Sequence, residues 1–223
     1  MRPIVITGFP AYGGRSLNPA HEVMRAMDGK TIDGVEVIGR PLPVSIKSLR
    51  REVGKIVEEI QPAAVVSFGL WPGEAMIRLE RVGLNFGDFE IPDNDGTILH
   101  DTALSSNGTE ARFATLPLRR IERGMLEAGI PARVTSTAGT FLCNACLYSF
   151  LEATEGRAPR TVCGFIHVPY LPEQVAQALA QRRNQRAFGV ENCEWPSMDL
   201  SMLVRAAEIA VRETVLSETP RVG

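Results

Sequence analysis

The chain has 223 residues, of which 44% are hydrophobic and 22% are charged, so it can bury the core of one domain of ordinary size. Its formal net charge of -2 provides no basic field for nucleic acid. The N-terminal apolar stretch is too short for the hydrophobic part of a signal peptide, and no later segment approaches the length of a membrane span. We therefore predict a cytoplasmic protein with no nucleic-acid or membrane partner, folded as one domain over 1–216 with a frayed tail over 217–223.

The first half of the chain alternates short β-branched segments with longer amphipathic ones. Asn18 and Pro19 supply an N-cap and a first-turn proline for a helix that ends near Met27. Strands are predicted at 4–7, 35–38 and 63–68, helices at 20–27 and 45–60, an extended arm at 76–86 and a turn at 91–96. This alternation is typical of helices packed on both faces of a largely parallel sheet.

The second half continues the alternation, with helices predicted at 112–126, 143–153, 173–182 and 198–215 and strands at 134–137 and 162–168. The predicted fold class is α/β: a single-domain α/β/α sandwich with a twisted, largely parallel central sheet. Sheets of this kind bind ligands at the carboxyl ends of their strands, and both Cys143 and His167 are predicted to lie near such ends.

Cys143 follows a small, turn-prone segment and begins an apolar stretch, so it is predicted to lie in the first turn of a helix. Unpaired N–H groups and the helix dipole favour a thiolate there, which indicates a nucleophile. The other cysteines, at positions 146, 163 and 193, are too few and too unevenly spaced for a disulfide framework. We expect reduced thiols.

A thiol nucleophile needs a base, and the chain has three histidines. His21 lies within a predicted helix and His100 follows a turn-rich stretch, so both are expected at the surface. His167 ends an apolar segment and should project from a strand end, which makes it the best base by location. A histidine at a strand end is nevertheless more often structural, and a free cysteine often packs as a small apolar residue.

Other motifs are less specific. Cys143 and Cys146 have the spacing of a zinc or redox hook, but the chain has no second pair. The glycine-rich segment 8–14 follows a strand, yet it lacks the spacing and the lysine of a phosphate-binding loop. Neither pattern indicates a cofactor, and we expect none.

Several short motifs resemble, in matching order from Thr7 to Gln174, those of the pyroglutamyl peptidases, the pyrrolidone-carboxylate cysteine peptidases. They are Thr7-Gly8-Phe9 with Gly13-Gly14 and Asn18-Pro19, Glu80-Arg81-Val82, Ile91-Pro92-Asp93-Asn94 with Gly96, Ala138-Gly139-Thr140-Phe141 with Cys143-Asn144, and Gly164-Phe165-Ile166-His167-Val168-Pro169. Five matches in order are far more specific than one.

The resemblance implies that Cys143 is the nucleophile, His167 the base and Glu80 its acidic partner. The implied reaction is acyl transfer from an N-terminal pyroglutamyl group, through a thioester, on a small peptide with a blocked N-terminus. Without the resemblance, Glu80 reads as half of an exposed ion pair with Arg81. The family also implies a homo-oligomer, often a homotetramer.

The family binds its neutral lactam in an apolar, aromatic pocket. The residues of this chain that the resemblance assigns to the substrate are Phe9, Tyr12, Asn18, Leu70, Ile91, Phe141 and Leu142. The apolar ones could equally be ordinary core, and Asn18 is fully explained as a helix N-cap.

Two of the departures from the family pattern alter the expected site. Leu70 stands where the family usually has a glutamine, and Glu90 stands where it usually has an arginine near the developing oxyanion. An oxyanion donor stabilises the transition state by about 3 kcal/mol, so its replacement by a carboxylate bears directly on activity. Two alternatives therefore stay open: a divergent enzyme for another small acyl or amide substrate, and a non-catalytic small-molecule binding relative.

Overall fold

A seven-stranded sheet forms the centre of the protein, whose computed structural model describes residues 1–185 and 195–218. The strand order is β2-β3-β1-β4-β9-β5-β8, and β1, β3, β4 and β9 are parallel. β5 runs antiparallel to β9 and parallel to β8, while β2 is antiparallel to β3. The strands are β1 (Ile4–Gly8), β2 (Thr31–Ile32), β3 (Val35–Pro41), β4 (Ala64–Leu70), β5 (Ile77–Glu80), β8 (Ala132–Thr135) and β9 (Val162–Val168).

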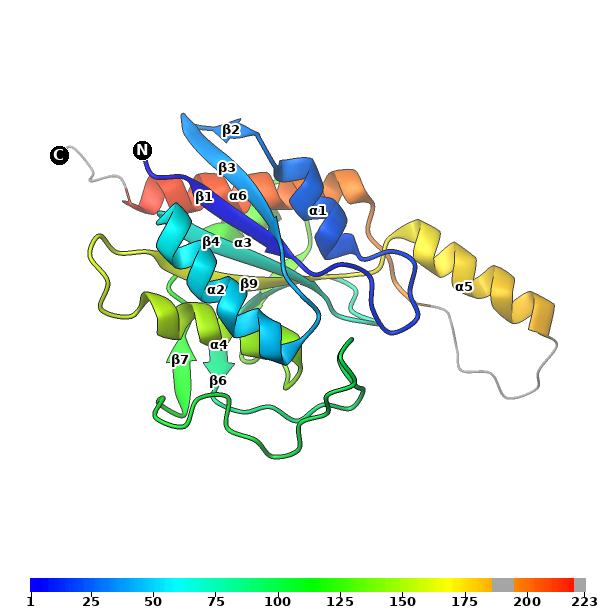
Figure 1. The fold of residues 1–223 in the computed structure, drawn as a ribbon. Helices are drawn as coiled ribbons and strands as arrows, with labels where there is room; N and C mark the ends of the chain where they lie inside the picture. The colour runs from blue at the N-terminus through cyan, green and yellow to red at the C-terminus, as the bar shows by residue number, and fades with distance from the viewer. Residues whose placement is uncertain (186–194, 219–223) are drawn as a thin grey trace.

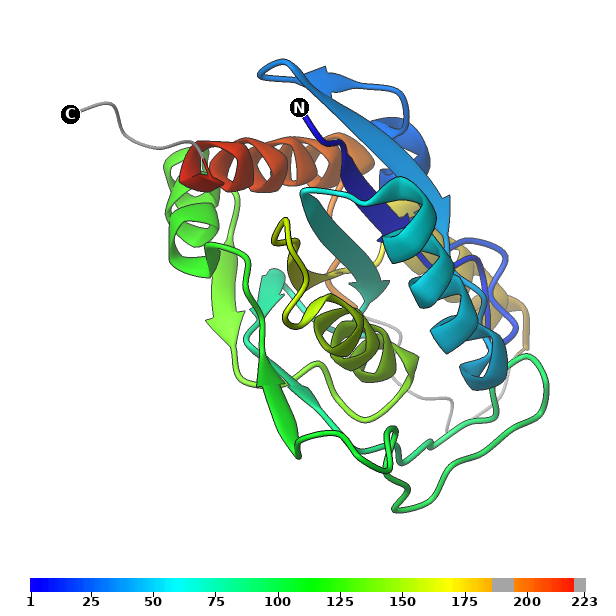
Figure 2. The ribbon, with the colours of Figure 1, turned by 60° about the vertical axis from the view of Figure 1, so that its left-hand side comes forward.

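Helices cover both faces of this sheet, as Figures 1 and 2 show from two directions. One face carries α1 (Pro19–Met27), α3 (Leu118–Glu127) and α6 (Leu200–Glu218), and the other carries α2 (Ile46–Ile60) and α4 (Leu142–Thr154). α5 (Pro172–Gln185) extends away from the sheet in Figure 1. The predicted α/β/α sandwich with a largely parallel sheet is therefore confirmed.

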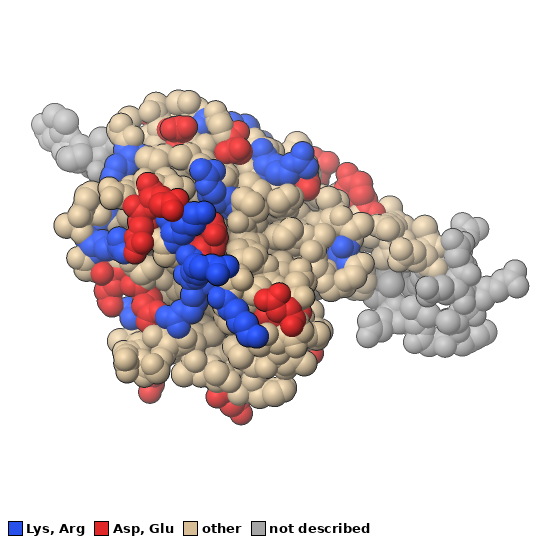
Figure 3. All heavy atoms as spheres, viewed as in Figure 1, with Lys and Arg blue, Asp and Glu red and all other residues tan. Residues whose placement is uncertain are grey.

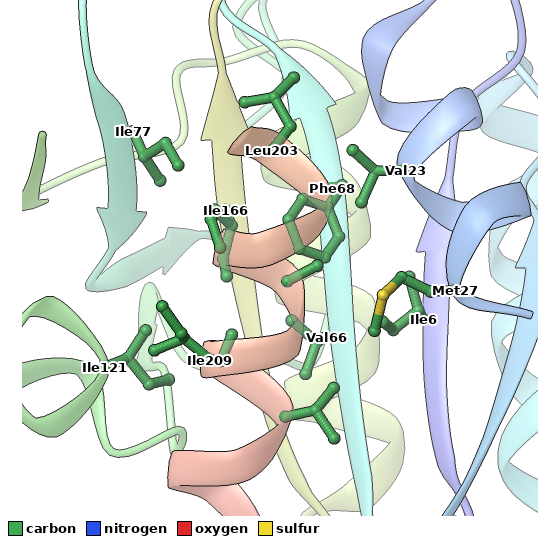
Figure 4. Packing of buried hydrophobic residues seen from close by; sticks show 14 of the residues in the cluster. Ile6, Val23, Met27, Val66, Phe68, Ile77, Ile121, Ile166, Leu203 and Ile209 are labelled. Atoms are coloured by element: carbon green, nitrogen blue, oxygen red, sulfur yellow. The ribbon is translucent and has the colours of Figure 1, made fainter. Parts of the chain in front are cut away.

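The larger core lies between the sheet and α6, as the close-up in Figure 4 shows. Val66 and Phe68 of β4 and Ile166 of β9 are fully buried there, facing Leu203 of α6. Full burial of a side chain of this size contributes about 1.5–3 kcal/mol to folding. This packing fixes the two central strands from one side, so their carboxyl ends can hold functional side chains on the other.

On the opposite face of the sheet, ion pairs connect α2 with α4 and the residues that follow it. Arg50 of α2 pairs with Glu152 of α4, with 2.6 Å between Nη2 and Oε2. Arg157, just after α4, lies 3.7 Å from Glu58 of α2. Positive and negative side chains accordingly alternate over this region of the surface in Figure 3. The face presents interleaved charges of both signs.

A long arm, residues 85–108, runs across the carboxyl edge of the sheet below α4 in Figures 1 and 2. Its Asp93 carboxylate accepts the backbone N–H of Ile46 at the start of α2, at 2.9 Å, and those of Asp95 and Thr97 within its own turn. This attachment to a helix N-terminus explains the Pro-Asp-Asn motif structurally, because the first-turn N–H groups of a helix need acceptors.

Two predicted segments were partly wrong. The helix expected at 112–126 begins only at Leu118, because residues 111–113 form β7 (Ala111–Phe113) and Pro117 takes the N-cap position. β7 pairs antiparallel with β6 (Val82–Leu84) in a separate two-stranded ribbon. The arm expected at 76–86 is extended, yet its first part is a sheet strand, since Leu79 of β5 is fully buried between β9 and β8.

Some predictions fall at or beyond the described residues. The expected frayed tail, 217–223, lies mostly outside them, and its first two residues continue α6 instead. Cys193 also lies outside the described residues. Within the described ranges, no helix combines the length and apolar character needed to cross a membrane.

Candidate active site

Strand register brings a polar cluster together on the sheet face that α2 and α4 cover. In the antiparallel pairing of β5 with β9, Arg78 lies opposite His167 and Glu80 opposite Phe165. Since successive strand residues point to opposite faces, these four side chains share one face, while Leu79 joins the core on the other.

An imidazole and a carboxylate form the centre of this cluster. Nδ1 of His167 lies 2.9 Å from Oε1 of Glu80, and both side chains are at most 1% exposed. Thr135, the register partner of Glu80 on β8, donates its hydroxyl to Oε2 at 2.6 Å. Arg78 donates Nε–H to Oε1 at 2.9 Å. Both oxygens of Glu80 are thus satisfied, which fixes the carboxylate that orients the imidazole.

The charge states of this pair follow from burial and from these contacts. Burial alone would raise the pKa of Glu80, but hydrogen bonds from His167 and Thr135 and the charge of Arg78 outweigh it, so the pKa is lowered and the carboxylate is ionised. Burial lowers the pKa of His167 despite the opposing effect of Glu80. With Nδ1–H directed at Glu80, the neutral imidazole presents Nε2 as an acceptor.

Cys143 is the second residue of α4 and approaches the same two strands. Gly69 of β4 is the register partner of His167, and a Cβ built on Gly69 would lie 2.9 Å from the Cys143 sulfur. The chain enters α4 through a turn at Gly139, whose φ of +79° favours glycine. The thiol is therefore held at the start of a helix, over the strand pair that carries the imidazole.

The pKa of the thiol at this helix start is raised, whereas the helix start alone was expected to lower it. Burial raises the pKa of the Cys143 thiol above its ordinary value, and the charges of Cys146 and Glu80 act in the same direction. A backbone hydrogen bond at Cys143 lowers the pKa, but it does not outweigh these effects. Both pKa shifts favour a neutral thiol and a neutral imidazole, so we expect the thiolate to form as its proton moves to a base during reaction.

Cys143 and His167 both line a cavity of about 460 Å³ at the carboxyl ends of β4 and β9. Among the predicted substrate residues, Tyr12, Leu70, Ile91 and Phe141 line the same cavity. Its volume lies within the range of small-ligand pockets. The sequence thus identified residues from five separate segments that the fold brings to one cavity.

A second, much smaller cavity of about 10 Å³ lies beside the first and shares with it Tyr12, Leu70, Phe141 and Cys143. The remaining predicted substrate residues, Phe9, Asn18 and Leu142, line only this inner cavity. Asn18 is occupied there as the N-cap of α1: it accepts the N–H of Ala20 at 3.0 Å and donates to the carbonyl of Pro10 at 3.1 Å.

The cavity wall combines aromatic rings with charges of both signs. Phe141 packs edge-on against Phe89 with ring centroids 4.6 Å apart. Burial, together with the nearby Cys143, raises the pKa of Tyr12 to about 12, so its hydroxyl stays protonated and can donate a hydrogen bond. Arg15 lies 5.3 Å from the Tyr12 ring centroid and lines the cavity together with Glu90.

The sequence analysis gave no role to Arg78, Thr135 or Trp71 of the cluster, and it found Glu80 only through the resemblance. Glu80 was read without the resemblance as an exposed partner of Arg81, whereas it is fully buried and bonded to Arg78. The alternation Arg78-Leu79-Glu80 was the available signal, because it places both charges on one strand face. Trp71, whose ring centroid lies 4.9 Å from that of His167, had no comparable signal.

The other titratable candidates lie elsewhere. His21 is half-buried rather than exposed, and its buried Nδ1 has no hydrogen-bond partner among the described residues. His100 is 79% exposed, as expected. Cys146 is fully buried and its sulfur lies 3.6 Å from the hydroxyl oxygen of Ser67. Within the described ranges, no group of three or more His, Cys, Asp or Glu residues has the geometry of a metal site.

Comparison with known proteins gives a consistent result over nearly the whole chain. The sequence model described as pyroglutamyl peptidase matches residues 2–217. A pyrrolidone-carboxylate peptidase of Thermococcus litoralis is 37% identical over 212 residues, which cover 95% of this chain and 92% of that protein. One from an Enterobacter species is 42% identical over 176 residues, covering 79% and 82% of the two chains.

Solved structures resemble this fold equally well. A mutant pyrrolidone carboxyl peptidase from Pyrococcus furiosus superposes with a TM-score of 0.89 at 32% identity, covering 97% of this chain and 100% of that one. The enzyme from Thermococcus litoralis superposes with a TM-score of 0.88 at 35% identity, covering 100% and 99%. The likeness therefore extends over the full length of both chains.

Proposed function

This chain belongs to the pyroglutamyl peptidase family, and on that premise we propose that it is a cysteine peptidase that releases an N-terminal pyroglutamyl (5-oxoproline) residue from peptides. The observation that carries the proposal is the shared cavity of Cys143 and His167, with Glu80 bonded behind the imidazole at 2.9 Å. A thiol, a base and a group that orients the base are what acyl transfer to sulfur requires.

In the proposed reaction the neutral Nε2 of His167 takes the thiol proton while the Cys143 sulfur attacks the pyroglutamyl carbonyl carbon. The tetrahedral intermediate then collapses as the C–N bond breaks and His167 protonates the leaving amine. Water, deprotonated in turn by His167, attacks the thioester, and the C–S bond breaks to release 5-oxoproline and the thiol. Glu80 remains ionised throughout and stabilises the imidazolium of each step.

First-turn N–H groups of α4 are suited to stabilise the oxyanion. The N-cap of α4 is Phe141, and the N–H groups of Leu142 and Cys143 that follow have no intrahelical acceptor. They point from the positive end of the helix dipole toward the region of the nucleophile. This donor set is independent of the residue at position 90.

The lactam ring is proposed to lie against Tyr12 and Phe141, which line both cavities. The inner cavity holds about 10 Å³ in the structure, roughly the space of a single water-sized probe. An acyl ring therefore occupies the larger cavity or displaces Phe141 to open the inner one. Because Tyr12 lines both cavities and its hydroxyl stays protonated, we propose it as the hydrogen-bond donor to the lactam carbonyl.

The test is release of a fluorescent amine from its pyroglutamyl amide, under reducing conditions at neutral pH, by wild type and Cys143→Ala. Activity in wild type alone supports the proposal, whereas no activity in folded wild type contradicts it. Alkylation by iodoacetamide adds a second readout: Cys143 should react faster than Cys146 and Cys163, which are 0% and 1% exposed.

Glu90 and Leu70 favour a second candidate, a related enzyme for another small acyl or amide substrate. Both line the cavity, where Glu90 adds a negative charge and Leu70 an apolar surface. If this candidate is right, the double variant Glu90→Arg with Leu70→Gln gains pyroglutamyl activity over a weak wild type. A double variant no better than wild type would count against it.

We further propose that the protein works in the cytoplasm as a homo-oligomer, a homotetramer by analogy with the family. Besides that analogy, α5 extends away from the sheet and carries Leu179, an apolar side chain that is 41% exposed and that a second copy would cover. Sedimentation equilibrium at micromolar concentration should give a multiple of the 24.4 kDa chain mass, and a monomer mass would exclude this assembly.

A further inference from the structure

Arg78 lies directly behind the proposed catalytic pair, and the reaction steps described above do not use it. Its side chain is only 12% exposed although it carries a full charge. Nε donates to Oε1 of Glu80 at 2.9 Å, and Nη2 donates to the carbonyl of Thr137 at 3.3 Å. Its guanidinium carbon also lies 3.7 Å from the ring centroid of Trp71, which is stacking distance.

Trp71 in turn contacts the imidazole. The rings of Trp71 and His167 are 4.9 Å apart and nearly perpendicular, at 82°. The Trp71 backbone is fixed by donation of its N–H to the carbonyl of Val168, at 3.0 Å. Arg78 therefore touches both Glu80, which bonds Nδ1, and Trp71, which packs against the imidazole ring.

We propose that Arg78 is a positioning residue that braces Glu80 and Trp71 around His167 and supplies the positive charge that balances Glu80. The inference deepens the proposed peptidase function and rests on it. A buried carboxylate needs a compensating charge, and that charge comes either from a separate cation or from a proton on its partner imidazole. Arg78 as the cation leaves the imidazole neutral and able to act as a base.

The charged and titratable groups around His167 come from several elements. β5 contributes Glu80 and Arg78, the turn after β4 contributes Glu74, and α4 contributes the thiol of Cys143. The cavity that His167 lines also holds Arg15, Asp88 and Glu90. The Glu74 carboxylate contacts two arginines: its Oε2 lies 3.4 Å from Nη1 of Arg78 and 2.8 Å from Nη2 of Arg133 on β8.

Behind the imidazole, the carboxylates of Glu74 and Glu80 are therefore matched by the guanidiniums of Arg78 and Arg133. Removal of the Arg78 charge leaves an excess negative charge next to the imidazole, which favours its protonation. As the pH falls, the imidazole of His167 would then become protonated, and so unable to act as a base, at a higher pH than in the wild type.

The test compares Arg78→Met, which removes the charge at similar volume, with Arg78→Lys, which keeps it without the planar stack. Arg133→Met is the matched control, because it removes the other arginine on Glu74 without touching Glu80 or Trp71. Two pH profiles are measured for each variant: kcat/KM on the pyroglutamyl amide, and the rate of iodoacetamide alkylation of the peptide that contains Cys143. The second profile needs no substrate.

For Arg78→Met we expect kcat/KM to fall by about tenfold and the acidic limb of both profiles to move upward by about half a pH unit or more. Arg78→Lys should return the limb toward the wild-type position while recovering only part of the rate. Arg133→Met should keep the wild-type limb. Arg78→Gln, which can still donate to Glu80, replaces Arg78→Met if that variant does not fold, with the same expected shift.

If the acidic limbs of the two pH profiles do not move in Arg78→Met or Arg78→Gln, the proposal is overturned even if the rates fall. Arg78 would then contribute packing only. An equal shift in Arg133→Met also overturns it, since the effect would then belong to the general field of the cluster. Failure of the proposed function has a different signature: wild type releases no amine, and the alkylation profile still decides the role of Arg78.

Discussion

Asn144, which directly follows the proposed nucleophile, ties α4 to the start of the arm at residues 85–108. Its Oδ1 accepts the N–H of Leu84 at 2.8 Å, and its Nδ2 donates to the carbonyls of Leu84 at 2.9 Å and Phe86 at 2.8 Å. The side chain is fully buried. We predict that Asn144→Ala destabilises the protein severely, because it removes all three bonds without offering water a route to the backbone groups.

The magnitude follows from these contacts. Each hydrogen bond contributes about 1 kcal/mol net, and a buried backbone donor or acceptor left without a partner costs a further 1–3 kcal/mol. Local relaxation of the arm around the vacated side chain lowers the sum, so we expect a loss of about 3–5 kcal/mol. This is a large fraction of the roughly 5–15 kcal/mol that stabilises a typical domain.

Urea unfolding of Asn144→Ala and wild type measures this loss, with the slope of the transition checked for two-state behaviour. Ser149→Ala is the control: Ser149 lies on the same helix, is 6% exposed, and makes no side-chain hydrogen bond within the described ranges. It should cost less than about 1 kcal/mol. An Asn144→Ala variant no less stable than this control would refute the reasoning.

Three further predictions concern the site itself. kcat/KM should fall as the pH drops through the pKa of His167, and because burial lowers that pKa, the midpoint of the fall should lie below about pH 6.5; a midpoint above it would contradict a neutral resting imidazole. Glu80→Gln should lower kcat by about a hundredfold or more, since the charge that stabilises the imidazolium is lost. Steady-state kinetics measure this loss and circular dichroism checks that the variant is folded; a folded variant with a kcat near that of the wild type would contradict the role of Glu80. In Gly69→Ala the new Cβ would lie 2.7 Å from ring carbons of Phe165 and 2.9 Å from the Cys143 sulfur. The free energy of unfolding should therefore fall by about 2 kcal/mol, and kcat/KM should fall with it. Urea titrations and activity assays measure the two effects, and wild-type values in both would count against such tight packing.

Local sequence patterns predicted the elements that hold the thiol and the imidazole. The N-cap of α1 at Asn18, the apolar stripe of α2 and the β-branched runs of β4 and β9 all lie within a few residues of their predicted bounds. These elements are strongly periodic or fully buried, so their own residues carry the signal. Cys143 and His167 could therefore be assigned to a helix start and a strand end without any structure.

Pairing between distant strands could not be predicted in this way. β5 lies between β9 and β8, from segments more than 50 residues away, and nothing in its own four residues specifies those partners. The role of Glu80 depends on that pairing, so it came only from the resemblance. Residues 111–113 were misassigned for the same reason, since β7 is stabilised by pairing with β6 and by no periodicity of its own.

The position of Cys143 at the start of α4 gains a different meaning once burial is included. A helix N-terminus was expected to favour the thiolate at rest, yet burial raises the pKa of the thiol and so favours its protonated form. The field of the helix therefore does little in the resting state, where sulfur and imidazole are both neutral. It acts when negative charge develops, first on sulfur and then on the carbonyl oxygen of the tetrahedral intermediate. An interaction that strengthens along the reaction lowers the barrier more than one already present at rest, so a half-buried, neutral thiol at the start of a helix is the more effective arrangement for acyl transfer.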